Sequence, residues 1–261
     1  MTGEVLLDVA GQIATITFSN PAKRNALTFH MRRELISRLR RSQQDPTVRV
    51  VVLKGDGDEA FVAGADISEL AEFATPAEVQ SEAERLDAEL AGAWDRLEKP
   101  VVAMIQGYCL GAGLLLALDA DIRIAAEGSQ FAIPAARLGL GLGSAYVEAL
   151  VATIGSSWAT EVLFSARRLS AAEALEIGLV NHVVSRDELR KFTMGLADEI
   201  ARNAPLTIAA IKVAIRQRRL EPAQRDHARV KAMVEACVNS DDLKEGQAAF
   251  QEKRSPRFTG R

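Results

Sequence analysis

Two short glycine-containing segments are the places in this sequence where the backbone itself could do chemistry. In the first, Gly111-Ala112-Gly113 separates an apolar strand, 101–105, from an apolar helix that we expect to begin near Leu114. Glycine lets a chain turn with positive φ, and the first N–H groups of a helix have no partner within it. Gly64-Ala65 is the second segment. Both could donate backbone hydrogen bonds to developing negative charge, although tight strand-to-helix packing also favours such glycines.

Several side chains that can transfer protons lie near these segments in the chain. Tyr146 is a candidate catalytic residue because a phenol can donate or relay a proton. Glu148 is the second candidate, with an exposed helix charge as its alternative role. Further acidic candidates lie at the end of the expected helix and after the second glycine segment: Asp119, Glu69 and Glu72. Arg137 could pair with an acidic side chain or line the entrance of a pocket.

The elements that must position these residues alternate between strands and helices. Two strands, 5–9 and 13–18, are predicted to form a hairpin, and an amphipathic helix follows from about Leu27. Thr75-Pro76-Ala77-Glu78 has the pattern of a helix start and predicts a helix to about Leu97. The remaining predicted elements are strands 48–54, 101–105, 122–125 and 130–133 and a helix over 144–154. This alternation predicts an α/β fold with parallel crossovers.

The pattern becomes mostly helical after about residue 185. Ser185-Arg186-Asp187-Glu188 resembles a capping box, and Pro205 and Pro222 separate later helices. We therefore expect a core over residues 1–190 and a helical C-terminal region over residues 191–261.

Composition and charge exclude several classes of protein. The formal net charge of -3 argues against a nucleic-acid binder. Cys109 and Cys237 are the only cysteines and the three histidines are scattered, so neither a disulfide scaffold nor a metal site is expected. The N-terminus lacks the pattern of a signal peptide and no apolar run reaches membrane-spanning length, so we expect a cytoplasmic protein without a membrane segment.

Taken together, eight separated segments resemble the enoyl-CoA hydratase/isomerase, or crotonase, family. They are residues 20–27, 61–67, 99–103, 107–113, 121–125, 171–174, 178–180 and 250–254. Their order is that of the family, and they cover nearly the whole chain. The resemblance implies a crotonase-like spiral of repeated ββα units with a helical C-terminal trimerisation region, in a homotrimer or a dimer of trimers. It also implies an acyl-CoA thioester substrate and no cofactor beyond the coenzyme A that the substrate carries.

The resemblance assigns roles to individual positions. In the family, two backbone N–H groups hold the thioester oxygen while it becomes an enolate, and Ala65 and Ala112 match those donors. Lys23 and Arg24 match a loop beside the CoA phosphates and adenine, where cations suit phosphates. Lys253 matches a basic residue that reaches the nucleotide end, often in a neighbouring subunit. Ala63, Asp66 and Ile67, which surround the donor Ala65, match residues that bind CoA in the family.

The chain departs from the family pattern where proton transfer takes place. Hydratases of the family use two glutamates, and the matching positions here hold Leu115 and Ala135. An aspartate used by other members falls near Gly143, where no carboxylate stands. Because a positioned acid or base contributes about 10²–10⁴ in rate, three functions stay open. They are hydration with other acid and base groups, different enolate chemistry such as isomerisation or decarboxylation, and acyl-CoA binding without catalysis.

Overall fold

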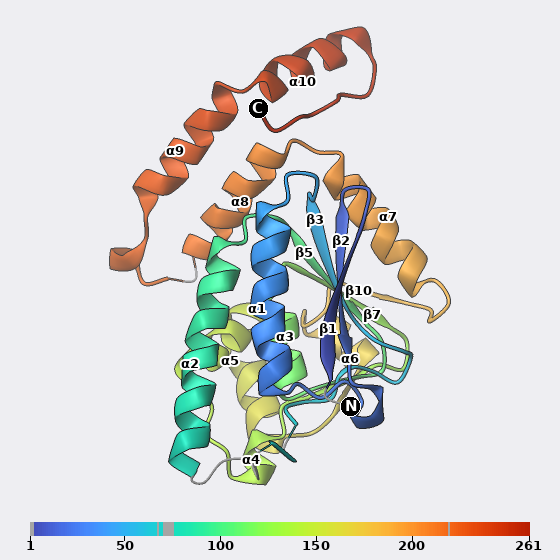
Figure 1. The fold of residues 1–261 in the computed structure, drawn as a ribbon, viewed down its shortest axis with the longest axis vertical. Helices are drawn as coiled ribbons and strands as arrows, with labels where there is room; N and C mark the ends of the chain where they lie inside the picture. Colours follow the sequence, from blue (N-terminus) through green and yellow to red (C-terminus); the bar gives the residue numbers. More distant parts are fainter. Residues whose placement is uncertain (1–2, 67, 70–75, 219) are drawn as a thin grey trace.

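The computed structural model describes residues 3–66, 68–69, 76–218 and 220–261, and its strands form two sheets (Figure 1). The larger sheet has the strand order β1-β2-β3-β5-β7-β10. Strands β1 and β2 pair as an antiparallel hairpin, as predicted, and the other neighbours pair in parallel. Its strands are β1 (Glu4–Ala10), β2 (Ile13–Ser19), β3 (Val50–Gly55), β5 (Val101–Ile105), β7 (Ile122–Ala126) and β10 (His182–Val184).

The smaller sheet consists of short strands in the order β4-β6-β8-β9. These are β4 (Ala60–Val62), β6 (Tyr108–Leu110), β8 (Gln130–Ala132) and β9 (Leu169–Ser170). Successive passages of the chain run from the larger sheet to the smaller one and then into a helix. The passages are β3-β4-α2, β5-β6-α3 and β7-β8-α4, with helices α2 (Pro76–Arg96), α3 (Ala112–Asp119) and α4 (Ala135–Leu138). This repetition confirms the predicted spiral of ββα units.

Helices cover both faces of the larger sheet. On one face, α1 (Phe29–Gln44) buries Met31, Leu35 and Leu39 against apolar side chains of the sheet, such as Ile16 and Leu53. On the other face, α7 (Leu189–Ala201) packs against the opposite side chains of the central strands. Because alternate residues of a strand point to opposite faces, the continuous apolar runs of β3 and β5 fill both layers. The remaining helices of the core are α5 (Ser144–Ser165) and α6 (Ala171–Glu176).

Two glycines at the start of α3 are required by the backbone. Gly111 has φ 50° and ψ -120°, a combination that is sterically open to glycine and closed to other residues. A Cβ atom on Gly113 would lie 2.0 Å from the carbonyl oxygen of Val62. Gly113 thus lets the first turn of α3 pack directly on β4, which is the packing role expected as the alternative for this motif.

The C-terminal helices extend away from the two sheets. In Figure 1, α9 (His227–Val238) and α10 (Asp241–Glu252) lie at one end of the molecule, beyond α8 (Pro205–Gln217). Helix α8 is tied to the core by an ion pair, in which Nζ of the buried Lys212 lies 2.7 Å from Asp121 Oδ2. The same carboxylate accepts the N–H of Val101 at 2.7 Å. Asp121 therefore anchors both β5 and the first C-terminal helix.

Two predicted helix boundaries differ from the structure. The predicted capping box over 185–188 is wrong, because this segment is a turn and α7 begins only at Leu189 with no side-chain cap. Arg186 in that turn pairs instead with Asp58 at 3.1 Å. Helix α5 continues eleven residues beyond the predicted end at Ile154, with a kink at Gly155 (φ 75°, ψ 162°). The predicted cap Thr75 lies outside the described residues.

Helix α5 is long and apolar enough, by length and composition alone, to cross a membrane. Polar residues interrupt its apolar run, so the sequence pattern predicts no segment of membrane-spanning length here. In the structure, α5 is kinked and buries Leu150, Ile154, Ala159 and Val162. A core helix of a globular protein passes the same test, so a single helix of this kind is weak evidence for a membrane span.

Candidate functional site

The parallel register of the small sheet brings three loop segments together. Strand β6 lies between β4 and β8, with Val62 opposite Cys109 and Leu110 opposite Ala132. Parallel strands end at the same edge of a sheet. The residues that follow the three strands therefore converge there, and they include Ala65, Ala112 and Ala135.

The two predicted donor segments lie next to each other. A Cβ on Gly111 would lie only 3.8 Å from the Cα of Gly64. Ala65 lies opposite Leu27 in an isolated parallel β-bridge. The two hydrogen bonds of this bridge are made by the residues on either side of Ala65: Leu27 N donates to Gly64 O, and Asp66 N donates to Leu27 O. The N–H of Ala65 takes no part in either bond.

Ala112 is the first residue of α3, and its N–H has no acceptor within the helix. The N–H groups of Leu114 and Leu115 reach back to the carbonyl of Gly111, at 3.0 and 3.1 Å. Among the described residues, the hydrogen bonds thus leave the N–H groups of both Ala65 and Ala112 without an acceptor. Two adjacent unpaired donors can stabilise one oxyanion.

One face of α3 is turned away from the core. Ala112, Leu115 and Asp119 share this face by helical spacing and are partly exposed, whereas Gly113, Leu114 and the 116–118 turn are buried. Leu115 therefore stands one turn beyond the donor Ala112. Ala135, the first residue of α4, is buried beside the same strand ends. Both positions that the sequence comparison predicts to match the family's glutamates thus carry apolar side chains.

Tyr146 belongs to a polar cluster formed by several helices. Burial, together with the Asp87 carboxylate to which the phenol hydrogen bonds, raises the pKa of Tyr146 above its ordinary value. Asp87 of α2 in turn pairs with Arg32 of α1 at 3.1 Å. Asp119 adds a further negative charge near the phenol. These surroundings keep the phenol protonated and make it a weaker acid than an ordinary tyrosine, so Tyr146 is unsuited to act as a base at neutral pH.

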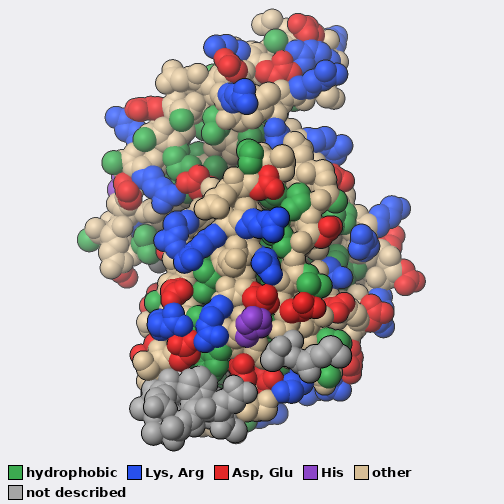
Figure 2. Space-filling view, in the orientation of Figure 1, with side chains coloured by type: hydrophobic (Ala, Val, Ile, Leu, Met, Phe, Trp, Pro, Cys, Tyr) green, Lys and Arg blue, Asp and Glu red, His purple; other side chains and the backbone are tan. Residues whose placement is uncertain are grey.

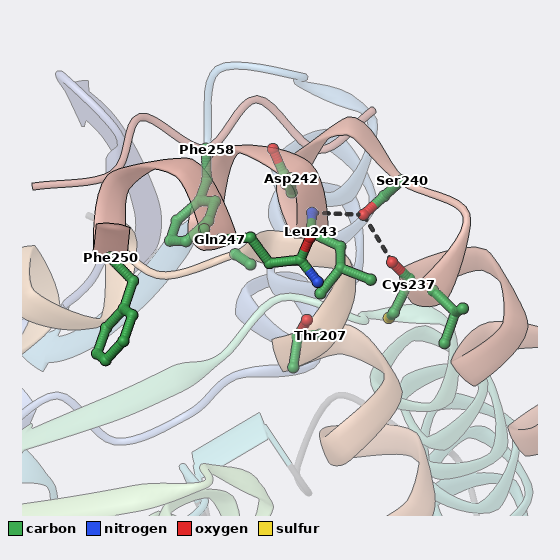
Figure 3. Close-up of a pocket in the computed structure, with 11 residues that line it drawn as sticks. Thr207, Cys237, Ser240, Asp242, Leu243, Gln247, Phe250 and Phe258 are labelled. Carbon is green, nitrogen blue, oxygen red and sulfur yellow. Dashed lines mark hydrogen bonds between the residues drawn. The ribbon is translucent and has the colours of Figure 1, made fainter. Parts of the chain in front are cut away.

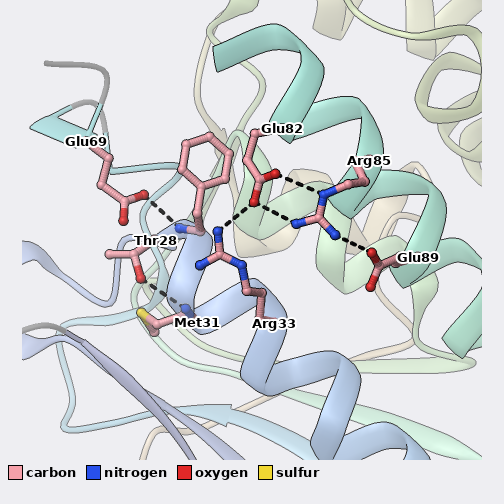
Figure 4. A network of polar contacts seen from close by, with 8 residues as sticks. Thr28, Met31, Arg33, Glu69, Glu82, Arg85 and Glu89 are labelled. Carbon is pink, nitrogen blue, oxygen red and sulfur yellow. Dashed lines mark hydrogen bonds and ion pairs between the residues drawn. The ribbon is translucent and has the colours of Figure 1, made fainter. Parts of the chain in front are cut away.

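The other acid and base candidates lie elsewhere. Glu148 is exposed and two residues from Tyr146, so the two side chains point to different faces of α5. Glu69 accepts the backbone N–H of Phe29 at 2.7 Å and, with Thr28, caps α1 (Figure 4). Glu72 lies outside the described residues. Arg137 donates to the carbonyl oxygen of Ser165 at 3.4 Å.

A surface network joins α1 to α2 beside this cap. Figure 4 shows Glu82 accepting from both Arg33 and Arg85, and Arg85 also pairing with Glu89. The two arginines hold the pKa of the Glu82 carboxyl at about 2. Figure 2 shows Lys and Arg intermixed with Asp and Glu over this face. The charged side chains of α1 and α2 pair with one another on this face and do not form a continuous basic surface.

The structure brings some of the predicted CoA-binding residues together. Lys23 Nζ donates to Asp66 Oδ2 at 2.7 Å and to Ser68 Oγ at 2.6 Å. Burial would raise the pKa of the Asp66 carboxyl, but these hydrogen bonds from Lys23 and Ser68 lower it below its ordinary value. Ala63 N donates to the carbonyl oxygen of Arg24 at 3.1 Å, which ties the basic loop to the donor segment Gly64-Ala65.

The remaining two predicted CoA-binding residues are Ile67 and Lys253. Ile67 lies outside the described residues. Lys253 ends α10 in the left-handed conformation (φ 55°), and Figure 1 places α10 at the opposite end of the molecule from α3 and α4. Within one chain, Lys253 therefore lies away from α3 and α4.

Sequence reasoning missed two residues beside Arg24. The Arg24 guanidinium lies 5.0 Å from the ring centroid of Tyr108, and that of Arg168 lies 5.5 Å from the same centroid. No local pattern connects these positions, because their contact depends on the register of three strands. Among the described residues, no group of His, Cys, Asp and Glu could hold a metal ion.

Comparison with known proteins identifies the relatives of this chain. A sequence model described as enoyl-CoA hydratase/isomerase matches residues 8–261. The 2,3-dehydroadipyl-CoA hydratase of Escherichia coli (strain K12) is 32% identical over 261 residues, which is 99% of each chain. The short-chain-enoyl-CoA hydratase of Clostridium acetobutylicum is 34% identical and covers 96% of this chain and 95% of its own.

Solved structures agree with the sequence relatives. An enoyl-CoA hydratase from Bacillus anthracis superimposes with a TM-score of 0.91 at 30% identity, covering 99% of this chain and all of its own. A putative enoyl-CoA hydratase/isomerase family protein from Hyphomonas neptunium gives a TM-score of 0.91 at 31% identity, covering 98% of each chain. With the repeated ββα architecture and a family match over nearly the whole length, the chain belongs to the enoyl-CoA hydratase/isomerase family.

Proposed function

We propose that this protein converts an acyl-CoA thioester through an enolate whose oxygen is held by the backbone N–H groups of Ala65 and Ala112. The observation that carries the proposal is the pair of adjacent donors that lack an acceptor in the described structure. Oriented donors stabilise charge most strongly where charge develops during the reaction, and removal of one typically costs about 10²–10³ in rate. The coenzyme A enters as part of the substrate, and no separate cofactor is needed for this chemistry.

The surroundings of the donors favour enolate chemistry that does not need the two usual glutamates. Leu115 and Ala135 cannot transfer protons. Decarboxylation of a malonyl-type thioester generates the enolate by loss of CO₂, so it requires no base. The enolate carbon then needs one proton, and we propose that the Tyr146 O–H leaves Asp87 to supply it, after which the phenolate takes a proton back from water. Isomerisation and hydration both require a base, so we favour them less than decarboxylation as the reaction of this site.

A panel of CoA esters tests this proposal. Purified protein is given 2-enoyl-, 3-enoyl- and malonyl-type CoA esters, and the products are separated by chromatography. We expect turnover of the malonyl-type ester and hydration of a short 2-enoyl-CoA slower by about 10⁴ than a two-glutamate mechanism would give. Hydration at ordinary enzyme rates would show that other residues replace the glutamates. Binding without any turnover would favour the non-catalytic alternative, and absence of binding would refute the CoA-ester function.

We also propose that the helical C-terminal region mediates assembly into homotrimers or dimers of trimers, in the cytoplasm. Support comes from a cavity of about 440 Å³ between the C-terminal helices (Figure 3), lined mainly by apolar side chains. Phe250 beside it is 87% exposed and Val238 is 61% exposed. Large apolar side chains so exposed in neighbouring helices are typical of interaction surfaces. Cys237 in this cavity and the buried Cys109 are both free thiols, which suits a reducing compartment.

Replacing Phe250 with aspartate tests the assembly. We expect the wild-type protein to sediment as an assembly of three or six chains. The Phe250→Asp assembly should dissociate at protein concentrations at least about tenfold higher than the wild-type assembly does, because burial of an aromatic side chain contributes about 1.5–3 kcal/mol. Leu6→Asp is the matched control, since Leu6 is exposed on β1, distant in the chain from the C-terminal helices. Unchanged sedimentation of Phe250→Asp would remove this face from the interface.

A further inference from the structure

Two ion pairs join α1 to α2, and they lie in different surroundings. Arg33 Nη2 lies 2.6 Å from Glu82 Oε1, and the arginine side chain is 51% exposed. Arg32 Nη1 lies 3.1 Å from Asp87 Oδ1, and its side chain is only 16% exposed. Glu82 belongs to the surface network of Figure 4, whereas Asp87 also accepts the phenol O–H of Tyr146 from α5. The pair with the more buried cation therefore contacts a third helix.

Arg32 and Tyr146 both extend from the beginnings of helices. The N–H of Arg32 donates to the carbonyl oxygen of Thr28, the cap of α1, at 3.0 Å. The Arg32 guanidinium also lies 5.7 Å from the ring centroid of Phe29, within the range of a cation–π contact. Tyr146 is the third residue of α5. The helix starts thus fix both side chains, and Asp87 of α2 connects them.

Tyr146 faces the helix that carries the donor Ala112. Helices α3 and α5 pack against each other, and the negative charge of Asp119 on α3 acts on the phenol. Asp119 and Ala112 share the partly exposed face of α3. Tyr146 therefore connects the Arg32–Asp87 pair to the helix of the donor.

Proton delivery by Tyr146 places a negative charge on the phenol oxygen. In the proposed reaction the bond to the carboxyl carbon breaks, CO₂ leaves, and the electron pair stays behind as the enolate. The O–H bond of Tyr146 then breaks as a C–H bond forms at the α-carbon. The phenolate takes a proton from water, which is left as hydroxide. While the phenolate exists it lies beside the Asp87 carboxylate, and two neighbouring negative charges repel each other unless a cation is close.

We infer that Arg32 is a positioning residue for this proton delivery: it holds Asp87 and offsets the charge of that carboxylate while Tyr146 gives up its proton. The inference rests on the proposed function, since it requires Tyr146 to be the proton donor. Within the described part of the chain, Arg32 is the one cation paired with Asp87. Its loss leaves the phenolate to form beside an uncompensated carboxylate, so that protonation by bulk water competes with protonation by Tyr146.

The configuration of the product tests the inference. The assembled protein is given an α-methylmalonyl-type CoA ester in D₂O, and the configuration of the deuterated α-carbon is determined by NMR on a chiral derivative. A positioned acid contributes about 10²–10⁴ in rate, so the wild-type protein should give one configuration in large excess and Tyr146→Phe should give both. Arg32→Gln should lower the ratio of the two configurations at least about tenfold, the effect of one charge-assisted hydrogen bond. Arg32→Lys keeps the charge and should restore most of the ratio.

Ionisation of the phenol gives a second readout, independent of turnover. Tyr108 and Tyr146 are the only tyrosines of the chain, so in a Tyr108→Phe protein the ultraviolet absorbance of phenolate reports Tyr146 alone. Burial and the Asp87 carboxylate both raise the pKa of Tyr146. Adding Asp87→Asn should therefore shift the rise in absorbance to lower pH. An unchanged titration would show that Asp87 does not act on the phenol and would overturn the inference.

Arg33→Gln is the control for helix packing, because it removes the other ion pair between α1 and α2 and leaves Asp87 with its partner. Its product should keep the wild-type ratio, and a loss equal to that of Arg32→Gln would overturn the inference. A wild-type ratio from Arg32→Gln, with both configurations from Tyr146→Phe, would also overturn it and leave the proposed function intact. A single configuration from Tyr146→Phe, or no turnover by the wild-type protein, would refute the proposed proton delivery and the inference together.

Discussion

Replacement of Ala112 by proline is expected to lower kcat by about 10²–10³, because proline has no N–H and one oxyanion donor is lost. The change is measured on the CoA ester that the wild-type protein converts fastest. The affinity for free CoA, which has no acyl carbonyl, should stay the same. Loss of kcat with unchanged CoA binding is the signature of an interaction made in the transition state.

The fold should tolerate this replacement. Ala112 is the first residue of α3, and proline is favoured at that position because the N–H there bonds to nothing in the helix. The preceding residue must avoid the helical region of φ and ψ, and Gly111 does so with ψ -120°. Ala112→Gly serves as the control, since it retains the N–H. An Ala112→Pro protein that unfolds normally and keeps full kcat would show that this N–H is not a donor in the reaction.

The elements of this fold could be predicted largely because local patterns and chain order agree. The apolar runs of β3 and β5 and the turn residues around β1 and β2 predict strands that the structure contains. The pattern Ser-x-x-Glu, however, caps a helix at only one of the two places where it precedes a helix. Ser170 and Glu173 form a true capping box at α6, whereas Ser185 and Glu188 do not cap α7. Arg186 of the second segment pairs with Asp58 of a distant loop, a long-range contact that the sequence does not reveal.

The candidate site could be predicted in its backbone but not in its side chains. Glycines at 64, 111 and 113 mark the donor segments because glycine is required there for conformation or close packing. The partners of the charged residues follow from the packing of distant elements. Lys23 meets Asp66, Tyr146 meets Asp87, and Arg168 meets Tyr108 only after strands and helices have found their register. Residue type therefore identified candidates, and tertiary structure decided which of them are already engaged.

Installing glutamate at both Leu115 and Ala135 is expected to raise the hydration rate of a short 2-enoyl-CoA by about 10⁴ or more, because each positioned acid or base contributes about 10²–10⁴. Leu115 lies on the partly exposed face of α3, one turn beyond Ala112, so a glutamate there needs little repacking. Ala135 is buried, and burial raises the pKa of a carboxyl group. A raised pKa suits the member of the pair that must act as the acid.

The glutamine pair Leu115→Gln with Ala135→Gln separates proton transfer from shape, since it fills the same space without a titratable group. A large gain with the glutamates and none with the glutamines would mean that the two backbone donors already hold the thioester in a reactive position. Equal hydration rates for the glutamate and glutamine variants, both folded and able to bind CoA, would show that the donors do not hold the thioester in a reactive position. Because the donors act on the oxygen and the glutamates on carbon and water, adding Ala112→Pro should lower the gained rate by about 10²–10³. A loss of that size is expected only if the donors and the glutamates act on the same bound thioester.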